Sequence, residues 1–456
     1  MKVIIIGGSH AGLAACRLLK RLDESIEILL IERTSVLGFI PSSINLIFKN
    51  YFSEEEIDQG EAGDQATLES SGIQVFLNTT VTKIMAPEKK ICYEDNLTKL
   101  RTVIHYDYLI LATGSAHFAP LLPESNRDLN SIITYKKKSQ ILDAYHQLKN
   151  SQKIAIIGAG LIGLELANSL AKDPSKEIII VERMSRPLFR YFDQEITDEL
   201  IRHLPENVDL RLRENFNDYQ VIEENGKQKL KLQFFNDTTT TVDACVFAVN
   251  PKPEVELLRG VVDLDFDDTV LVNEYMQTSI PEIYALGDLV RIPFGPNLDK
   301  AYLPLISNAR KTALVAASHI AAATPLKMQP SQRTIGSKVF GVYLGSSGLT
   351  EEEAFLYDIE TSTVTKTYDF YSKYHLPKEF FLTIKAIYRK DNRQLLGAQL
   401  ITSRQDVLDY ISALAQVIVD QKTVDSLVFS ELFYSPDLSP SMNFLADLGL
   451  ESLVNN

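Results

Sequence analysis

The sequence contains no tryptophan and only three cysteines, Cys16, Cys92 and Cys245. Cysteines this few and this scattered exclude a disulfide framework, and none of them has the Cys-x-x-Cys or Cys/His spacing of a zinc site. Free thiols persist in a reducing compartment. We therefore expect a cytoplasmic protein that has neither a structural disulfide nor a bound metal.

Basic residues are also scarce, since 46 Lys and Arg stand against 60 Asp and Glu and the net charge is −14. Nucleic acids and anionic membranes bind clustered Lys and Arg, so we expect neither as a partner. No apolar run approaches the roughly 18 residues that an ordinary membrane span needs. The apolar start, MKVIIIGG, is broken at once by glycines, which is typical of a strand entering a turn and not of a signal peptide.

Two segments repeat one pattern, and they begin at Lys2 and Lys153. Each has a β-branched run, a glycine turn, a helical stretch with apolar residues at i, i+3 and i+4, and a second β-rich run that ends in Glu-Arg. Both segments are therefore βαβ units. With 456 residues and 45% hydrophobic content, the chain has room for about three domains.

The second glycine turn follows a predicted strand and opens a predicted helix, which makes it a strong dinucleotide signal. The first glycine permits the turn, the second lets the backbone approach a pyrophosphate, and the third lets the helix pack on the strand. Glu182 lies 19 residues past Gly163, where a carboxylate accepts hydrogen bonds from a ribose 2′-OH and repels a 2′-phosphate. NADH is favoured over NADPH, although Arg183 lies beside this carboxylate. The expected NAD contacts are Gly158, Gly160, Leu161, Ile162, Gly163, Glu182 and Arg183.

The first glycine turn reads Gly7-Gly8-Ser9-His10-Ala11-Gly12, with serine in the place of the middle glycine. Serine is small enough to leave room for a pyrophosphate, and Glu32 lies 20 residues past Gly12. The better interpretation is a dinucleotide site here too. Two such sites on one chain indicate two different dinucleotides.

Further motifs complete a family resemblance. Ala112-Thr113-Gly114 forms a turn after a buried strand, and Gly287-Asp288 ends a later one. Together with the segments RPLFRYFD (186–193), GLTEEEA (348–354), SNARK (307–311) and FYSPDLSP (433–440), these turns resemble the FAD/NAD(P)-dependent pyridine nucleotide-disulfide oxidoreductases. The closest resemblance is to the branch of NADH oxidase, NADH peroxidase and coenzyme A disulfide reductase. It covers essentially the whole chain.

The resemblance implies an α/β fold with two Rossmann-like dinucleotide-binding domains and a C-terminal α+β dimerisation domain. Residues 1–115 and 245–330 would form the FAD-binding domain, 116–244 the NAD-binding domain and 331–456 the dimerisation domain, so a homodimer is expected. It places Asp288 at the ribityl or pyrophosphate region of FAD and makes Tyr191 a gate for the nicotinamide. The implied FAD contacts are Gly7, Gly8, Ser9, Ala11, Gly12, Glu32, Arg33, Val81, Ala112, Thr113, Gly114, Gly287, Asp288, Pro304, Leu305 and Ser307.

One departure from the family pattern concerns its redox cysteine. The family signature is Ser-Phe-x-x-Cys, whereas residues 38–42 read GFIPS, so Ser42 occupies the place of the cysteine. A thiolate is readily oxidised, but a serine hydroxyl stays protonated and stores no electrons. The other differences, at Gly38 and Pro41, favour a natural enzyme with another acceptor over an engineered replacement. The three cysteines are expected to be core or surface residues, with Cys16 the nearest to the flavin.

His10 holds the fourth position of the first turn, where the peroxidase members carry an active-site histidine. With an ordinary pKa near 6.5, it could supply a proton to an acceptor, or it could merely cap the helix.

The preferred hypothesis is an FAD-dependent NADH oxidoreductase in which hydride passes from NADH through flavin directly to a small-molecule acceptor. The acceptor would be dioxygen, giving peroxide, or an organic molecule such as a quinone or an activated alkene. His10, Ser42 and Tyr191 are the candidate catalytic residues. One alternative is an NADH oxidase, NADH peroxidase or disulfide reductase whose redox cysteine is substituted by serine. Another is a flavin-binding NADH sensor or scaffold without turnover.

Overall fold

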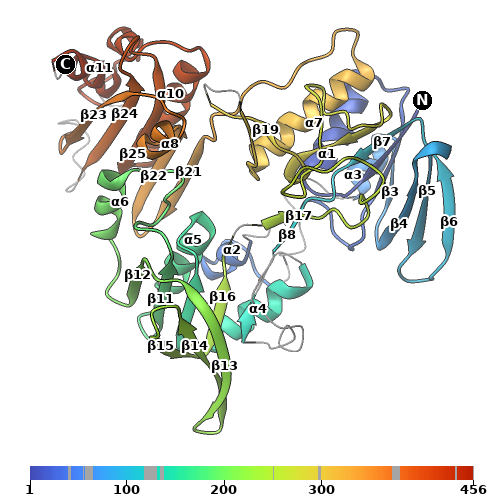
Figure 1. Ribbon diagram of the computed structural model, residues 1–456, viewed down its shortest axis with the longest axis horizontal. Coiled ribbons are helices and arrows are strands. Elements are labelled where there is room, and N and C mark those ends of the chain that lie inside the picture. The colour runs from blue at the N-terminus through green and yellow to red at the C-terminus, as the bar shows by residue number, and fades with distance from the viewer. Residues whose placement is uncertain are drawn as a thin grey trace.

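The computed structural model describes residues 1–39, 43–54, 56, 65–117, 131–133, 138–249, 251–295, 299–371, 380–436 and 439–454. They form three units, with the first at the right of Figure 1, the second at the bottom and the C-terminal unit at the upper left. No helix among these residues is long and apolar enough to cross a membrane. The predicted α/β fold class, with two dinucleotide-binding sheets and a C-terminal α+β unit, is confirmed.

The first unit is built on a parallel sheet of five strands in the order β18-β7-β1-β2-β3. Its strands are continuous apolar runs because helices cover the sheet, and Ile4 and Ile5 are fully buried. The strands are β1 (Lys2–Ile6), β2 (Glu27–Ile31), β3 (Ile73–Phe76), β7 (Tyr108–Leu111) and β18 (Ile283–Ala285). The helices of this part are α1 (His10–Leu22), α3 (Gln65–Ser70) and α7 (Ile306–Ala321), and an antiparallel sheet comprises β4 (Thr79–Met85), β5 (Lys90–Asp95) and β6 (Arg101–His105).

The second unit repeats this design with a parallel sheet in the order β12-β11-β10-β16-β9. Its strands are β9 (Ile132–Ile133), β10 (Lys153–Ile157), β11 (Glu177–Glu182), β12 (Val208–Leu212) and β16 (Ala244–Phe247). The helices are α4 (Lys138–Asn150), α5 (Leu161–Leu170) and α6 (Gln194–Ile201), and an antiparallel sheet comprises β13 (Phe216–Glu224), β14 (Lys227–Phe234) and β15 (Thr239–Val242). Figure 1 shows the β13–β14 hairpin projecting from the bottom of the molecule.

The chain passes from the first parallel-sheet unit to the second and back along a short antiparallel pair, β8 (Ser115–His117) with β17 (Pro251–Pro253). The boundary predicted at residue 245 falls inside β16, which pairs with β10. The sheet of the second unit therefore extends to Phe247. The sequence did not reveal this because β16 is as apolar as the strands of the first unit.

The C-terminal unit has an antiparallel sheet in the order β21-β22-β25-β24-β23. Its strands are β21 (Ile335–Val339), β22 (Val342–Gly348), β23 (Thr361–Tyr368), β24 (Leu382–Arg389) and β25 (Leu395–Thr402), and its helices are α8 (Glu351–Leu356), α9 (Gln405–Leu408), α10 (Tyr410–Val419) and α11 (Phe444–Val454). A short pair, β19 (Ile292–Pro293) with β20 (Lys300–Ala301), precedes α7.

The second and C-terminal units share one apolar core. Ile335, Leu344 and Ile401 of the C-terminal sheet pack with residues of β10 and α5. The helix α2 (Ser43–Phe48), although it follows β2 of the first unit, contributes Ile44 and Ile47 to this same core. The segment just after residue 42 therefore lies where the first and second units meet.

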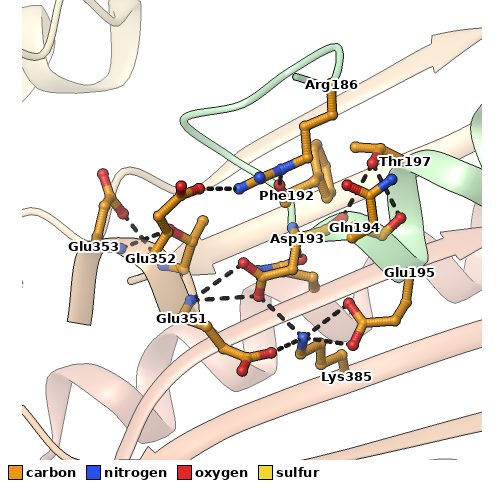
Figure 2. Close-up of polar contacts among 12 residues, drawn as sticks. Arg186, Phe192, Asp193, Gln194, Glu195, Thr197, Glu351, Glu352, Glu353 and Lys385 are labelled. Atoms are coloured by element: carbon orange, nitrogen blue, oxygen red, sulfur yellow. Dashed lines mark hydrogen bonds and ion pairs between the residues drawn. The ribbon is translucent and has the colours of Figure 1, made fainter. Parts of the chain in front are cut away.

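A buried charge cluster reinforces the junction between the second and C-terminal units (Figure 2). Lys385 on β24 is fully buried, and its ammonium lies 3.2 Å from Asp193 and 2.9 Å from Glu195 and also pairs with Glu351. The backbone N–H of Asp193 donates to the side chain of Gln399, and that amide donates back to the Asp193 carboxylate at 2.8 Å. Burial alone would lower the pKa of Lys385, but its carboxylate partners outweigh burial and raise the pKa, so the lysine stays charged.

Replacing Lys385 with methionine should destabilise the protein by about 3–5 kcal/mol, because the buried Asp193 carboxylate would lose its counter-charge. The matched control is Lys366→Met, which removes a more exposed lysine paired with Asp447 and Glu451 in the same unit. That control should cost below about 1 kcal/mol. Urea unfolding followed by circular dichroism measures the free energy of unfolding of both variants. Equal losses of stability would show that the buried cluster around Lys385 contributes no more than an exposed ion pair.

Candidate functional site

The first glycine turn is held by close backbone contacts. Gly7 has φ +109°, and a Cβ atom there would lie 2.2 Å from the carbonyl oxygen of Ala112. A Cβ atom on Gly12 would lie 1.9 Å from the carbonyl oxygen of Gly7. Side chains are excluded at both positions, so the turn, the end of β7 and the start of α1 meet at van der Waals distance.

The acidic and basic residues at the end of β2 reach back over that turn. The Glu32 carboxylate accepts hydrogen bonds from the backbone N–H of Gly8 at 2.7 Å and from that of Thr34 at 2.9 Å. Arg33 forms a two-pronged pair with Glu254 at 2.5 and 2.9 Å. The backbone of Glu254 accepts a hydrogen bond from the Thr113 hydroxyl and donates one to the Gly114 carbonyl. Glu32, Arg33, Thr113 and Gly114 are thus brought to one edge of the sheet.

The predicted Gly287-Asp288 turn joins the same region from another direction. Gly287 starts a short 3-10 helix (Gly287–Leu289), and a Cβ atom on it would lie 3.2 Å from the Cβ of Ala11. The hydroxyl of Ser115 donates a hydrogen bond to the Asp288 carboxylate. The Tyr302 hydroxyl lies next to these two groups, and its burial raises its pKa well above the ordinary value.

The last predicted FAD contacts differ in their surroundings. Leu305 precedes the first residue of α7 and packs against the core of the second unit, while Pro304 is half-buried and Ser307 is exposed. Leu305 therefore connects α7 of the first unit to the core of the second. Val81 is different, since its side chain is buried in the core of the first unit and pairs across the strand with Tyr93. Because the Val81 side chain is buried, only the backbone of this residue could contact a dinucleotide.

The second glycine turn has the same close backbone contacts as the first, but there is empty space beside one of its glycines. Gly158 has φ +107°, and a Cβ atom on Gly163 would lie 2.0 Å from the carbonyl oxygen of Gly158. A Cβ atom on Gly160, in contrast, would meet no atom within 4 Å. Open space in front of a helix N-terminus fits a pyrophosphate group, which the first N–H groups of α5 would bind. Leu161 and Ile162, which begin that helix, are half-buried.

Glu182 repeats the arrangement of Glu32. Its carboxylate accepts hydrogen bonds from the backbone N–H of Ala159 and of Met184, both at 2.9 Å. Arg183 is exposed beside it. Each sheet therefore presents a carboxylate to its own glycine turn, and the residues of both sites fit a dinucleotide.

The three predicted catalytic residues fall in different places. His10 is the first residue of α1, directly at the first glycine turn, and both of its ring nitrogens are buried. Ser42 lies outside the described residues. Tyr191 is half-buried, and burial raises the pKa of its hydroxyl. The backbone N–H of Tyr191 donates to Leu188, whose own N–H donates to Ala159 of the second turn at 2.9 Å. Tyr191 thus belongs to a loop that rests on the nucleotide turn.

All three cysteines are described, and none has the surroundings of a reactive thiolate. Cys16 is fully buried in α1, where burial raises its pKa to about 12. Cys245 is buried in β16, and burial raises its pKa even further. Cys92 lies half-buried on β5 in the outer antiparallel sheet. The expectation that these residues are structural agrees with these positions.

Sequence reasoning missed several residues of the site. Ser115 follows the predicted turn directly and could have been found from its position. Glu254 and Tyr302 carry no local signal, because only the fold brings Glu254 to Arg33 across 221 residues of chain.

Two parallel sheets that each present a glycine turn and a carboxylate define an oxidoreductase that binds two dinucleotides. The chain belongs to the family described as pyridine nucleotide-disulphide oxidoreductase, whose sequence model matches residues 1–313. The dimerisation domain of the same family matches residues 336–445. The predicted family is thereby confirmed, and the chain is an NAD(P)H oxidoreductase with sites for FAD and NAD(H).

Similar proteins include an NADH oxidase of Enterococcus faecalis, 28% identical with full coverage of both chains. A CoA-dependent NAD(P)H sulfur oxidoreductase of Pyrococcus abyssi is 27% identical over 96% of this chain and 95% of its own length. Among solved structures, an NAD-dependent persulfide reductase of A. fulgidus has a TM-score of 0.90 at 25% identity and covers all of this chain and 83% of its own. A water-forming NADH oxidase of Lactobacillus brevis has the same TM-score at 23% identity, covering all of this chain and 98% of its own, and shows the shared fold.

The open position in the second turn gives a direct test of the NAD site. Gly160→Ala should fold normally and retain FAD, because the added methyl group meets no protein atom. It should raise KM for NADH about tenfold, because the methyl group enters the space expected for the pyrophosphate. Gly163→Ala is the contrasting variant, since its Cβ atom would clash at 2.0 Å, and it should lose thermal stability as well. Steady-state kinetics and thermal unfolding measure both. An unchanged KM in Gly160→Ala would place NADH elsewhere.

Proposed function

We propose that this enzyme oxidises NADH at the second glycine turn and binds FAD at the first, and that it reduces its acceptor without a cysteine relay. FAD, when bound, supplies the two-electron redox chemistry that connects NADH to the acceptor. In this proposal Gly7, Gly12 and Asp288 hold FAD, while the N-terminus of α5 and Glu182 hold NADH. Glu182 would repel the 2′-phosphate of NADPH, which supports NADH as the preferred nucleotide.

The observation that carries this proposal is the state of the thiols. Cys16 and Cys245 are buried with raised pKa values, so neither is a thiolate at neutral pH. Cys92 lies on a strand of the outer sheet. Ser42 occupies the place of the family cysteine in the sequence and has no accessible oxidation state. In this proposal, therefore, none of the three cysteines stores the electrons taken from NADH.

The acceptor in this proposal takes both electrons in one encounter. With dioxygen, NADH and one proton give NAD⁺ and hydrogen peroxide, and reduction would stop there because a serine at position 42 cannot take up a peroxide oxygen as a cysteine does. A quinone or an activated alkene is an equivalent two-electron acceptor. Its second hydrogen arrives as a proton, and His10, an imidazole at the first turn, is the candidate donor. Tyr191 stays protonated because burial raises its pKa, so it orients groups by donating a hydrogen bond.

The dimerisation domain supports a homodimer. Large apolar side chains gather on the exposed surface of the C-terminal unit, where Phe429 is 83% and Phe433 73% exposed. A patch of this kind is typical of an interface between subunits.

The acceptor is identified by mixing the FAD-loaded protein anaerobically with NADH and following the absorbance near 450 nm, where flavins absorb. Separate runs then add oxygen, peroxide, a disulfide, a quinone and a conjugated alkene. We expect the absorbance to fall quickly with NADH and to return with an organic acceptor or with oxygen. In air, hydrogen peroxide should form in a ratio of about one per NADH oxidised. Fast recovery of the absorbance with peroxide or a disulfide would contradict the proposal. If peroxide or a disulfide restored the absorbance only in the variant Ser42→Cys, the result would favour an NADH oxidase, NADH peroxidase or disulfide reductase that has lost its cysteine.

Removing every thiol gives an independent check. The variant Cys16→Ala, Cys92→Ser, Cys245→Ala should keep its rate of NADH oxidation within about twofold. It should lose some stability, since two buried sulfur atoms are deleted. A loss of turnover without loss of bound FAD would show that one of these thiols takes part.

A further inference from the structure

The loop of residues 186–193 contacts the second glycine turn, yet it is also held by residues outside its own unit. On one side the N–H of Leu188 donates to Ala159 of the glycine turn at 2.9 Å. On the other side the loop meets the C-terminal unit, where Arg186 donates to Glu352 at 2.7 Å and Asp193 pairs with Lys385 (Figure 2). Any displacement of the C-terminal unit therefore acts on this loop.

Within the loop, Tyr191 is contacted by a buried arginine. Arg333 precedes β21 and is 6% exposed. The carbon centre of its guanidinium lies 5.3 Å from the ring centroid of Tyr191 and 4.8 Å from that of Phe294. A planar guanidinium between two aromatic rings restricts the orientation of both.

The guanidinium is itself fixed by the C-terminal unit. It donates to both carboxylate oxygens of Glu353, each at 2.6 Å, and to the carbonyl of Gly348 at 3.3 Å. Glu353 is locked in turn, because it forms a capping box with Thr350 at the start of α8. These contacts hold the Arg333 guanidinium against the start of α8 and the end of β22.

We propose that Arg333 is a positioning residue for NADH oxidation, holding Tyr191 against the nicotinamide dinucleotide bound at the second glycine turn. This inference rests on the proposed function, since it takes Tyr191 as part of that site. Arg333 does not touch the dinucleotide. Through Arg333, α8 and β22 hold the Tyr191 ring in place. The C-terminal unit therefore affects both the affinity for NADH and the rate of its oxidation.

A matched control lies elsewhere in the C-terminal unit. Arg393 also has a positive φ, +61° against +49° for Arg333. It pairs with Asp425 at 2.7 and 2.9 Å, and its guanidinium lies 5.1 Å from the ring centroid of Tyr388. These partners belong to the far part of the C-terminal unit and not to the loop. Arg393→Lys thus removes the same kind of contacts at a place where NADH oxidation should not depend on them.

The experiment compares Arg333→Lys with Arg393→Lys in the FAD-loaded protein. Lysine keeps the charge but has neither the planar face nor the two-pronged geometry. We expect Arg333→Lys to raise KM for NADH and to slow the anaerobic absorbance loss at saturating NADH, each about tenfold. Arg393→Lys should lower thermal stability to a similar degree and leave both kinetic values within about twofold. Equal kinetics in the two variants would overturn the inference.

A double variant tests whether Arg333 acts through Tyr191. If it does, adding Arg333→Lys to Tyr191→Leu should change the rate by less than about twofold, and independent, additive losses would contradict the inference. Where Arg333→Lys does not retain FAD, Glu353→Gln keeps Arg333 but replaces its two-oxygen carboxylate partner with a neutral amide, and it should raise KM by about threefold. A wild-type protein whose absorbance is not lost with NADH would refute the proposed function itself, and that outcome is distinct from unchanged kinetics in the Arg333 variant.

Discussion

The attachment of the second nucleotide site to the C-terminal unit depends on the buried ammonium of Lys385. It has no exposed surface, and two of its carboxylate partners, Asp193 and Glu195, come from the second unit. A charge in such a position is stable only while its partners remain in place. The pair therefore fixes the end of the loop that carries Tyr191 to the C-terminal sheet. Because Leu188 of that loop is bonded to the glycine turn, the chain of contacts runs from β24 to the nucleotide site without a gap.

Much of the two glycine turns could be predicted from the sequence, because their geometry is local. A strand, three small residues and a helix leave little freedom, and the third glycine of each turn does let the helix pack closely on the strand, since a Cβ atom on Gly12 or Gly163 would lie 3.3 Å from a strand isoleucine. The spacing also located Glu32 and Glu182 correctly at the ends of β2 and β11, where they accept bonds from the turns. The roles of individual site residues in binding FAD and NADH stay predictions.

The remaining features could not be predicted because they join distant parts of the chain. Nothing around Arg33 indicates that Glu254 neutralises it, and nothing around Tyr191 indicates Arg333. The domain boundary was misplaced by a few residues for a related reason, since an apolar strand fits either sheet and only the pairing of β16 with β10 decides between them. Composition describes how buried a strand is but not which neighbour it has.

The proposed reaction without a thiol relay and the attachment of the loop of residues 186–193 to the C-terminal unit bear on one another. In an enzyme with a thiol relay, the protein itself stores electrons between its two half-reactions. In the proposed reaction, in which Ser42 stands in the place of that thiol, the groups that bind NADH and the acceptor would have to control when each reacts. Tyr191, Arg333 and Glu353 form a continuous contact from the loop beside the second glycine turn to α8 of the C-terminal unit. A rigid contact of this kind keeps the nucleotide site assembled through each turnover, which is the requirement that remains when no covalent intermediate on the protein retains the electrons.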